Sequence, residues 1–176
     1  MAMTTGTIQA GSSVRVSGTF PPQGVGTTLN STVIVQTANA ETTTLTYGTG
    51  SGQVDLITDS CRTVTASSSN TYDLYTGTDL KDLDGLTCAF RKVKFVQISV
   101  VSGGDSSGVK VGGAAANEWV GFFDAAGDKH KMYPGGPAYL AGSPAGAAVG
   151  SSTKNLKIEN AGAVDAVVRI VIGGTS

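Results

Sequence analysis

The chain has a single histidine, His130, so any catalytic site that needs an imidazole base must form around it. A serine hydrolase combines a nucleophile on a sharp turn with a histidine that a carboxylate orients. The sequence contains no G-x-S-x-G motif, and His130 lies between Lys129 and Lys131 in a segment with the pattern of a solvent-facing strand. We therefore interpret His130 as a surface residue and predict no hydrolase site.

The densest group of carboxylates lies in the segment YTGTDLKDLDGLT and consists of Asp79, Asp82 and Asp84. A calcium loop of the EF-hand type needs oxygen ligands at alternate positions and a bidentate glutamate further along. Leu80 and Leu83 interrupt that spacing, and no glutamate follows. Acidic residues are also ordinary in the first turn of a helix. We predict one short helical turn over 79–83, capped by Thr78 and ended by Gly85, and no metal site.

Two further carboxylates, Glu118 and Asp124, have the residue types of a glycosidase pair, but the sequence does not fix their separation. Paired glycines could suggest phosphate-binding loops. None lies in GxxxxGK[ST] or opens a long helix after a strand, so we interpret them as β-turns. The pairs lie at 103–104, 112–113, 135–136 and 173–174. We predict that the chain is not an enzyme and has no catalytic or cofactor-binding residue.

The chain has two cysteines, Cys61 and Cys88. They could form a disulfide or a redox pair, or they could be two small buried hydrophobic residues in a reducing compartment. They form no CxxC motif and have no zinc-like spacing to other ligands. Because the N-terminal segment lacks the basic and apolar regions of a secretory signal, we favour the buried, unbonded alternative.

The main aromatic cluster consists of Trp119, Phe122 and Phe123, in a chain with only 6% aromatic residues. Exposed aromatic rings can stack on sugars. Aromatic clusters more often lie in a core or anchor a subunit interface. The sequence leaves these alternatives open.

Composition favours a β-rich protein of 176 residues with one domain, or one domain and a long arm. Hydrophobic residues make up 40% and charged residues only 14%, so serine, threonine and glycine must supply much of the surface. The net charge is −1 without a basic run, which argues against nucleic acid as a partner. No apolar stretch is long enough to span a bilayer, and we expect synthesis in a cytoplasm.

Short alternating segments separated by Gly, Ser and Asn predict an all-β fold, namely a β-sandwich or jelly-roll-like domain over residues 31–176. Residues 1–30 are predicted to form an extended N-terminal arm with one short strand around Val14 to Ser17. Predicted strands include 31–37, 52–58 and 61–67, the last two separated by a turn at Asp59-Ser60. A turn is also predicted at 134–136, and a small-residue loop in AGSPAGAAVGSS.

The longest predicted strand, 91–102, changes its apolar face midway, from Val93 and Phe95 to Val96, Ile98 and Val100, which indicates a bulge or a change of covering layer. The last segment, 155–176, has the pattern of a hairpin that turns at Asn160-Ala161-Gly162. Its second strand has an apolar face formed by Val164, Ala166, Val168, Ile170 and Ile172.

From about Thr42 onward the chain resembles small virion proteins of tailed bacteriophages and prophages. The closing pattern L.I.N.G....V.I.I.GTS is the most specific part of this resemblance. The stretches that carry it, in order, are VDLITDSCRTVTASSSNTYDL, DLKDLDGLTCAFRKVKFVQI, VKVGGAAANEWVGFF, KMYPGGPAYLAG and NLKIENAGAVDAVVRIVIGGTS.

The resemblance implies a structural role in the virion and transfers no catalytic residue. We expect a capsid decoration (cement) protein that binds the major capsid protein and forms a homo-oligomer such as a trimer. The arm and the Trp119 region are expected to make the contacts with neighbouring proteins. The alternative is a tail or fibre component that binds glycans, for which Trp119, Phe122 or Tyr139 should be exposed beside Asp or Asn side chains.

Overall fold

The computed structural model describes residues 13–17, 32–36, 42–82, 85–136 and 138–176, and these form strands, turns and loops without a helix. Apart from 13–17, the predicted arm over 1–30 lies outside the described residues. The predicted strand near Val14 is β1 (Ser13–Ser17), which pairs antiparallel with β2 (Thr32–Gln36).

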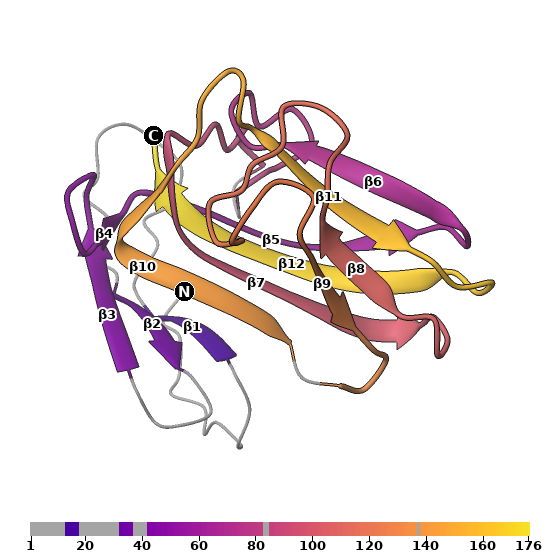
Figure 1. Cartoon of the computed structure of the whole chain (residues 1–176). Helices are drawn as coiled ribbons and strands as arrows, with labels where there is room; N and C mark the ends of the chain where they lie inside the picture. The colour runs from indigo at the N-terminus through magenta and orange to yellow at the C-terminus, as the bar shows by residue number, and fades with distance from the viewer. Residues whose placement is uncertain (1–12, 18–31, 37–41, 83–84, 137) are drawn as a thin grey trace.

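Two four-stranded antiparallel sheets pack face to face, which confirms the all-β sandwich predicted from the sequence (Figure 1). The first sheet has the order β10-β7-β12-β5, with β5 Leu56–Val64, β7 Lys92–Gly103, β10 Tyr139–Ala148 and β12 Ala166–Thr175. The second sheet has the order β6-β11-β8-β9, with β6 Ser68–Asp73, β8 Val109–Gly112, β9 Lys129–Met132 and β11 Asn155–Asn160.

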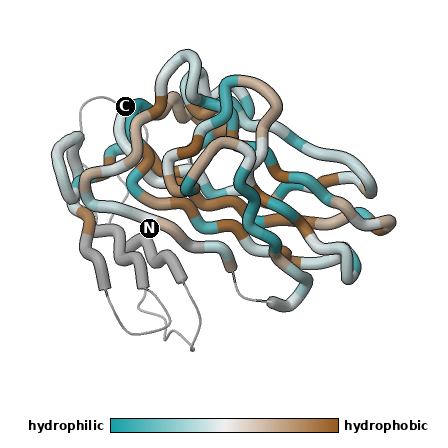
Figure 2. The backbone as a smooth tube through the Cα atoms, viewed as in Figure 1, coloured by the Kyte–Doolittle hydropathy of each residue, from teal (hydrophilic) through white to brown (hydrophobic). Residues whose placement is uncertain are grey.

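The core lies between these sheets, and Figure 2 shows hydrophobic residues concentrated along the strands that cross the middle of the molecule. Alternation explains the burial, because in β11 and β12 every second side chain points inward. Segments outside the strands add Leu74, Leu80, Phe90 and Trp119 to the same core. Among the largest buried side chains from the strands are Ile98, Leu156, Ile158, Ile170 and Ile172.

A third sheet, here called the N-terminal sheet, has the order β1-β2-β3-β4, with β3 Thr42–Tyr47 and β4 Gln53–Val54. Leu45 and Val54 pack against Phe95 and Val171, which point to the outer face of the first sheet and form a second small core. The turn between β3 and β4 also bonds to β10, since the Gly52 amide donates to the carbonyl of Pro144 at 2.9 Å.

The predicted bulge in the longest strand is confirmed at Lys94, where the pairing of β7 with β12 shifts by one residue. The shift separates Val93, which faces the main core, from Phe95, which faces the second core, so the prediction that these two share a side is wrong. Lys94 is only 2% exposed, and its ammonium donates to the carbonyls of Pro144 and Ala145, each at 2.9 Å. Burial lowers the pKa of this lysine.

The closing segment is not a hairpin. β11 pairs with β6 and β8, whereas β12 pairs with β5 and β7, so residues 161–165 cross from one sheet to the other. Asn160 holds this crossing, because its amide Nδ2 donates to the carbonyls of Val64 (3.0 Å) and Val164 (2.8 Å). Val164 is 52% exposed and does not continue the apolar face of β12, which begins at Ala166.

Two other predicted connections are strands. The expected turn at Asp59-Ser60 lies inside β5, where Asp59 forms an ion pair with Arg169 of β12. The expected loop of small residues lies largely in β10, whose pairing with β7 is interrupted between Gly142 and Ala147 opposite Lys94. Turn-forming residue types are misleading here because cross-strand partners decide the conformation. The predicted turn at 134–136 is confirmed, since the Gly136 amide donates to the carbonyl of Tyr133 at 3.0 Å.

Segment 74–82 contains turns and isolated bridges where a helical turn was predicted over 79–83; Leu83 itself lies outside the described residues. Thr78 does not cap a helix, and its hydroxyl lies 3.0 Å from that of Thr76. Leu80 is fully buried in the core, and Asp82 forms a bridge with Thr58 of β5. These tertiary contacts fix the segment as turns and bridges beside β5 in place of the predicted helical turn.

Candidate functional site

Trp119, the centre of the aromatic cluster, belongs to the core. It is 1% exposed, its indole Nε1 donates to the carbonyl of Ala148 at 3.0 Å, and Phe122 packs edge-on against it at 5.4 Å. Of the alternatives that the sequence left open, burial places Trp119 in the core, so it cannot stack on a sugar in this conformation.

A second aromatic group, here called the aromatic stack, lies at the edge formed by β9 and β10. The rings of Phe123 and Tyr139 are parallel with centroids 5.8 Å apart, and His130 lies 4.8 Å from Tyr139. His130 is exposed, as predicted, while Phe123 and Tyr139 are half-buried. The Tyr139 hydroxyl donates to the carbonyl of Phe122 at 3.2 Å, which leaves ring surface as the main feature that a ligand could contact.

The two carboxylates considered as a glycosidase pair differ in environment. Both oxygens of Glu118 accept backbone amides, one from Gly113 and one from Gly127 at 2.8 Å, so Glu118 braces the loop that leads to β9. Asp124 is exposed on the same loop. These two hydrogen bonds give the Glu118 carboxylate a structural role in holding the loop.

Neither cysteine is bonded, and the two differ in exposure. Cys88 is buried in the core, and burial raises the pKa of its thiol to about 12. Cys61 is exposed on the outer face of the first sheet, so the prediction that both are buried is wrong for this residue. Within the described ranges, which omit Asp84, no group of three His, Cys, Asp or Glu side chains is placed to hold a metal ion.

The structure contains a polar pocket of about 400 Å³ where β5 and β6 form one edge of the sandwich. Its lining comes from β5, β6 and the segment after β6, namely Arg62, Ser69, Asn70, Thr71, Tyr72 and Asp79. We call it the edge pocket. Both strands are the last of their sheets, so the pocket opens at the side of the sandwich rather than on a sheet face.

Two polar atoms of residues that line the edge pocket are closed off from solvent, namely Nε of Arg62, which has no hydrogen-bond partner within the protein, and the hydroxyl of Tyr72, whose candidate partner, the Asn70 side chain, lies outside good hydrogen-bond geometry. Tyr72 is 4% exposed, and burial raises the pKa of its phenol, although Asn70 and the charge of Arg62 act in the opposite direction. In the described part of the chain, the other buried side-chain atoms of this kind are the hydroxyls of Thr58 and Ser60. They occupy the preceding inward positions of β5, so the row of unpartnered groups continues from the pocket along one strand.

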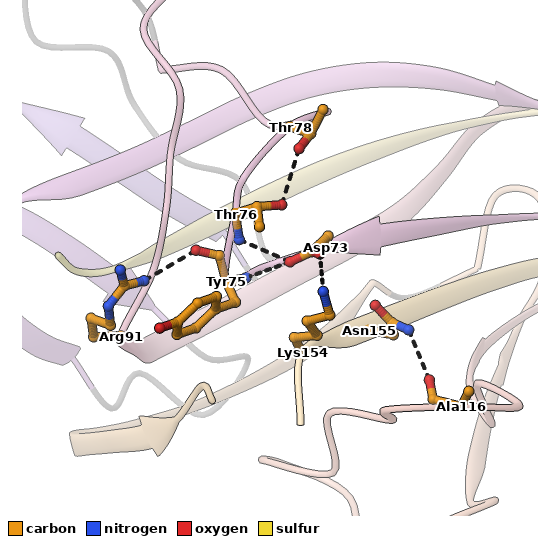
Figure 3. Close-up of polar contacts among 8 residues, drawn as sticks. All are labelled: Asp73, Tyr75, Thr76, Thr78, Arg91, Ala116, Lys154 and Asn155. Atoms are coloured by element: carbon orange, nitrogen blue, oxygen red, sulfur yellow. Dashed lines mark hydrogen bonds and ion pairs between the residues drawn. The ribbon is translucent and has the colours of Figure 1, made fainter. Parts of the chain in front are cut away.

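The segment that carries Asp79 into the edge pocket is fixed by Asp73 (Figure 3). One oxygen of Asp73 accepts the amides of Tyr75 (2.9 Å) and Thr76 (2.8 Å), and the other accepts the ammonium of Lys154 at 2.6 Å. Partial burial alone would raise the pKa of Asp73, but these hydrogen bonds outweigh it and lower the pKa. The loop in turn holds Arg62, whose Nη2 donates to the carbonyl of Asp79 at 2.9 Å.

The outer face of the second sheet carries a group of positive charges. Around the carboxylate of Glu159 lie the ammonium groups of Lys157 (2.9 Å), Lys129 (3.0 Å) and Lys110 (3.6 Å). Lys131 pairs with Lys110 in the sheet and follows Lys129 by two residues, so it belongs to the same face. We call these four lysines the lysine face. Hydrogen bonds from Lys157 and Lys129 lower the pKa of Glu159 to about 2.

Sequence reasoning missed the edge pocket, although one signal was visible. In β5 every second side chain, counted back from the buried Val64, points inward. The inner side of this strand therefore carries three polar residues, namely Arg62, Ser60 and Thr58. That pattern is unusual for a buried face and indicates an unusual environment.

No protein-family model matches this chain, and no curated protein matches it. Within the described residues, no helix is long and apolar enough to cross a membrane.

Proposed function

We propose that this chain is a non-enzymatic structural protein of a tailed-phage virion, a capsid decoration protein that binds the major capsid protein and stabilises the head shell. The resemblance of its segments to small phage virion proteins suggests this role. The observation that supports it most directly is the lysine face, because a charged sheet surface is suited to binding a complementary surface on another protein.

The charge of this surface is distinctive within the chain. Lys110, Lys129 and Lys157 surround one carboxylate and Lys131 lies on the same face, so the face has a local excess of positive charge on a protein whose formal net charge is −1. Ion pairs at such exposure contribute little to stability. Their arrangement instead favours recognition of an acidic surface, with attachment that weakens as salt rises.

The first test asks whether the chain is part of the particle. Particles of the phage or prophage that encodes it are purified, and their proteins are identified by mass spectrometry, with gold-labelled antibody to distinguish head from tail. We expect the protein on the head in many copies. Particles that lack the protein would refute the virion role, and label confined to the tail would refute decoration of the capsid.

The second test addresses the lysine face. Particles stripped of the protein are incubated with wild-type protein or with a Lys110→Glu, Lys131→Glu double variant, and occupancy is measured. We expect a strong loss of occupancy with the double variant, while Lys81→Glu, which changes an exposed lysine outside the second sheet, serves as the matched control. Equal binding by both variants would exclude this face as the contact surface.

A second candidate is a tail or fibre component that binds glycans, and the aromatic stack favours it. Tyr139, one of the residues predicted for this function, offers a half-buried ring beside Phe123 and exposed His130. A glycan array compares the wild type with a His130→Ala, Tyr139→Ala variant, and circular dichroism checks that the variant is folded. Binding that the variant retains in full would remove the stack from consideration.

A further inference from the structure

The lysine face has one carboxylate at its centre, that of Glu159, which three of the four lysines approach. From this arrangement we infer that Glu159 is a specificity-determining residue. It makes the lysine face select a protein surface whose carboxylates surround a hydrogen-bond donor, and it excludes a continuous polyanion such as DNA. The inference deepens the proposed function and rests on it for the partner, whereas the exclusion of polyanions rests on this chain alone.

The fold gathers the lysines from separate parts of the chain. Glu159 lies opposite Lys110, which lies opposite Lys131, so these side chains form a row across β11, β8 and β9. Lys157 and Lys129 each precede a member of this row by two residues and therefore project from the same face. The five side chains sum to a charge of +3, four ammonium groups less one carboxylate. The lack of a basic run in the sequence therefore does not by itself exclude a basic surface that could attract nucleic acid.

Glu159 is within reach of a partner. Its side chain keeps 23% of its exposure, and both of its hydrogen bonds, from Lys129 at 3.0 Å and Lys157 at 2.9 Å, end on Oε2. Oε1 lies 3.6 Å from the ammonium of Lys110, which is beyond hydrogen-bond distance. Oε1 can therefore accept a hydrogen bond from a donor on a partner, while the partly exposed ammonium groups around it donate to the partner's carboxylates.

A continuous polyanion does not match this pattern of charges. Phosphates repeat along DNA with no positive group between them, so a duplex that contacts the lysines also brings negative charge towards Glu159. Juxtaposed like charges oppose association. Glu159 stays ionised near neutral pH, because hydrogen bonds from Lys157 and Lys129 lower its pKa to about 2. A protein surface can instead place a donor at Glu159 and carboxylates at the lysines, so the difference between the two affinities favours the protein.

The first arm of the test measures binding of the full chain to a fluorescein-labelled DNA duplex by fluorescence anisotropy at several salt concentrations. We expect Glu159→Gln to bind the duplex at least about tenfold more tightly than the wild type, because the lysines lose the carboxylate that repels phosphates. The slope of log K against log salt should become steeper by about one. Adding Lys110→Glu and Lys131→Glu to this variant should abolish the gain, which would locate it on the lysine face.

Asp59→Asn is the matched control. It also removes one carboxylate from an ion pair on the outer side of a sheet, but its pair with Arg169 belongs to the first sheet, on the opposite side of the sandwich. Both variants change the net charge of the chain equally, so Asp59→Asn should stay within about twofold of the wild type on the duplex. Circular dichroism checks that each variant is folded.

The second arm measures attachment of the same proteins to particles stripped of this protein. We expect Glu159→Gln to attach no more tightly than the wild type, because the donor on the shell loses a charge-assisted hydrogen bond when the lysines lose their central carboxylate. The ratio of particle affinity to duplex affinity should therefore fall at least about tenfold.

Three results would overturn the inference. The first is a duplex affinity of Glu159→Gln no higher than that of the wild type, which would mean that Glu159 does not exclude polyanions. The second is an equal gain on particles and on the duplex, which would identify Glu159 as a counter-ion without selectivity. The third is an equal duplex gain with Asp59→Asn, which would mean that net charge alone sets binding. If the wild type does not attach to particles, the proposed function and its carboxylate-bearing partner both fail, whereas the duplex measurements still decide whether Glu159 excludes polyanions.

Discussion

Replacing Tyr72 by phenylalanine removes a single oxygen atom from a buried position and should make the protein more stable. Tyr72 is 4% exposed, and its hydroxyl forms no hydrogen bond of good geometry, although the Asn70 side chain lies close enough to lower its pKa. A buried polar group without a partner costs about 1–3 kcal/mol relative to its solvated state. The ring keeps its packing in the core, so the free energy of unfolding should rise by about 1 kcal/mol. For a domain of this size, that corresponds to an increase in Tm of about 2–4 °C.

The assay is thermal and urea unfolding of the wild type and of two single variants. Tyr139→Phe is the matched control, because the Tyr139 hydroxyl donates to the carbonyl of Phe122 at 3.2 Å. Loss of that hydrogen bond should lower stability by about 0.5–1.5 kcal/mol, so the two substitutions should have opposite signs. If Tyr72→Phe destabilises the protein as much as Tyr139→Phe does, the Tyr72 hydroxyl has an effective internal partner in Asn70, which would refute the expected gain.

Three further results are expected. Glu159→Gln should lower the free energy of unfolding by about 1 kcal/mol at neutral pH. Because the pKa of Glu159 in the folded protein is depressed to about 2, acid-unfolding curves should show the advantage of the wild type fading as pH drops from about 4.5 to about 2. An advantage that persists at the lowest pH would contradict this expectation. Gly77→Ala should destabilise the protein by more than the roughly 1–3 kcal/mol of backbone strain, because φ is +64° and a Cβ would lie 2.0 Å from the Cys88 carbonyl oxygen. Gly85→Ala should cost less in the same urea titration, because its φ is +82° but a Cβ there would meet open space. Iodoacetamide should modify Cys61 alone in the folded protein and both cysteines in urea, as measured by intact mass; labelling of Cys88 in the folded state would mean that the core opens readily.

The fold class could be predicted because alternation determines which side chains are buried. Leu156 and Ile158 face the core as their spacing indicates, and Ala166, Val168 and Ile170 do the same in β12. Alternation does not identify the partner of a strand, however. The segment 155–176 has the local pattern of a hairpin, and only the contacts with β6 and β5 show that its two strands belong to opposite sheets. Strand partners depend on contacts between residues far apart in the sequence, which a local pattern does not contain.

The chemistry that could be sought from the sequence was limited to motifs with known spacing, and the edge pocket has none. Arg62 and Tyr72 come from strands of different sheets, and Asp79 reaches them only because Asp73 and Lys154 fix the intervening loop. A helical turn was predicted over 79–83, whereas the structure has turns and bridges there that bring the carbonyl of Asp79 to Arg62.

The inward direction of the Arg62 side chain could nevertheless be predicted from its position in the strand. It raises the question of what satisfies a polar group on the core side of a sheet. A polar side chain on the core side of a strand either finds partners inside the protein or keeps hydrogen-bonding capacity for something else. Lys94 is an example of the first case, since a four-residue interruption in β10 brings two carbonyls to its ammonium. Arg62 is only partly satisfied, because the Asp79 carbonyl accepts from one terminal nitrogen and leaves Nε unpaired. Nε of Arg62 is closed off from solvent, so β5 carries the cost of an unpaired donor within its packing, and Tyr72→Phe measures the same kind of cost on the neighbouring strand.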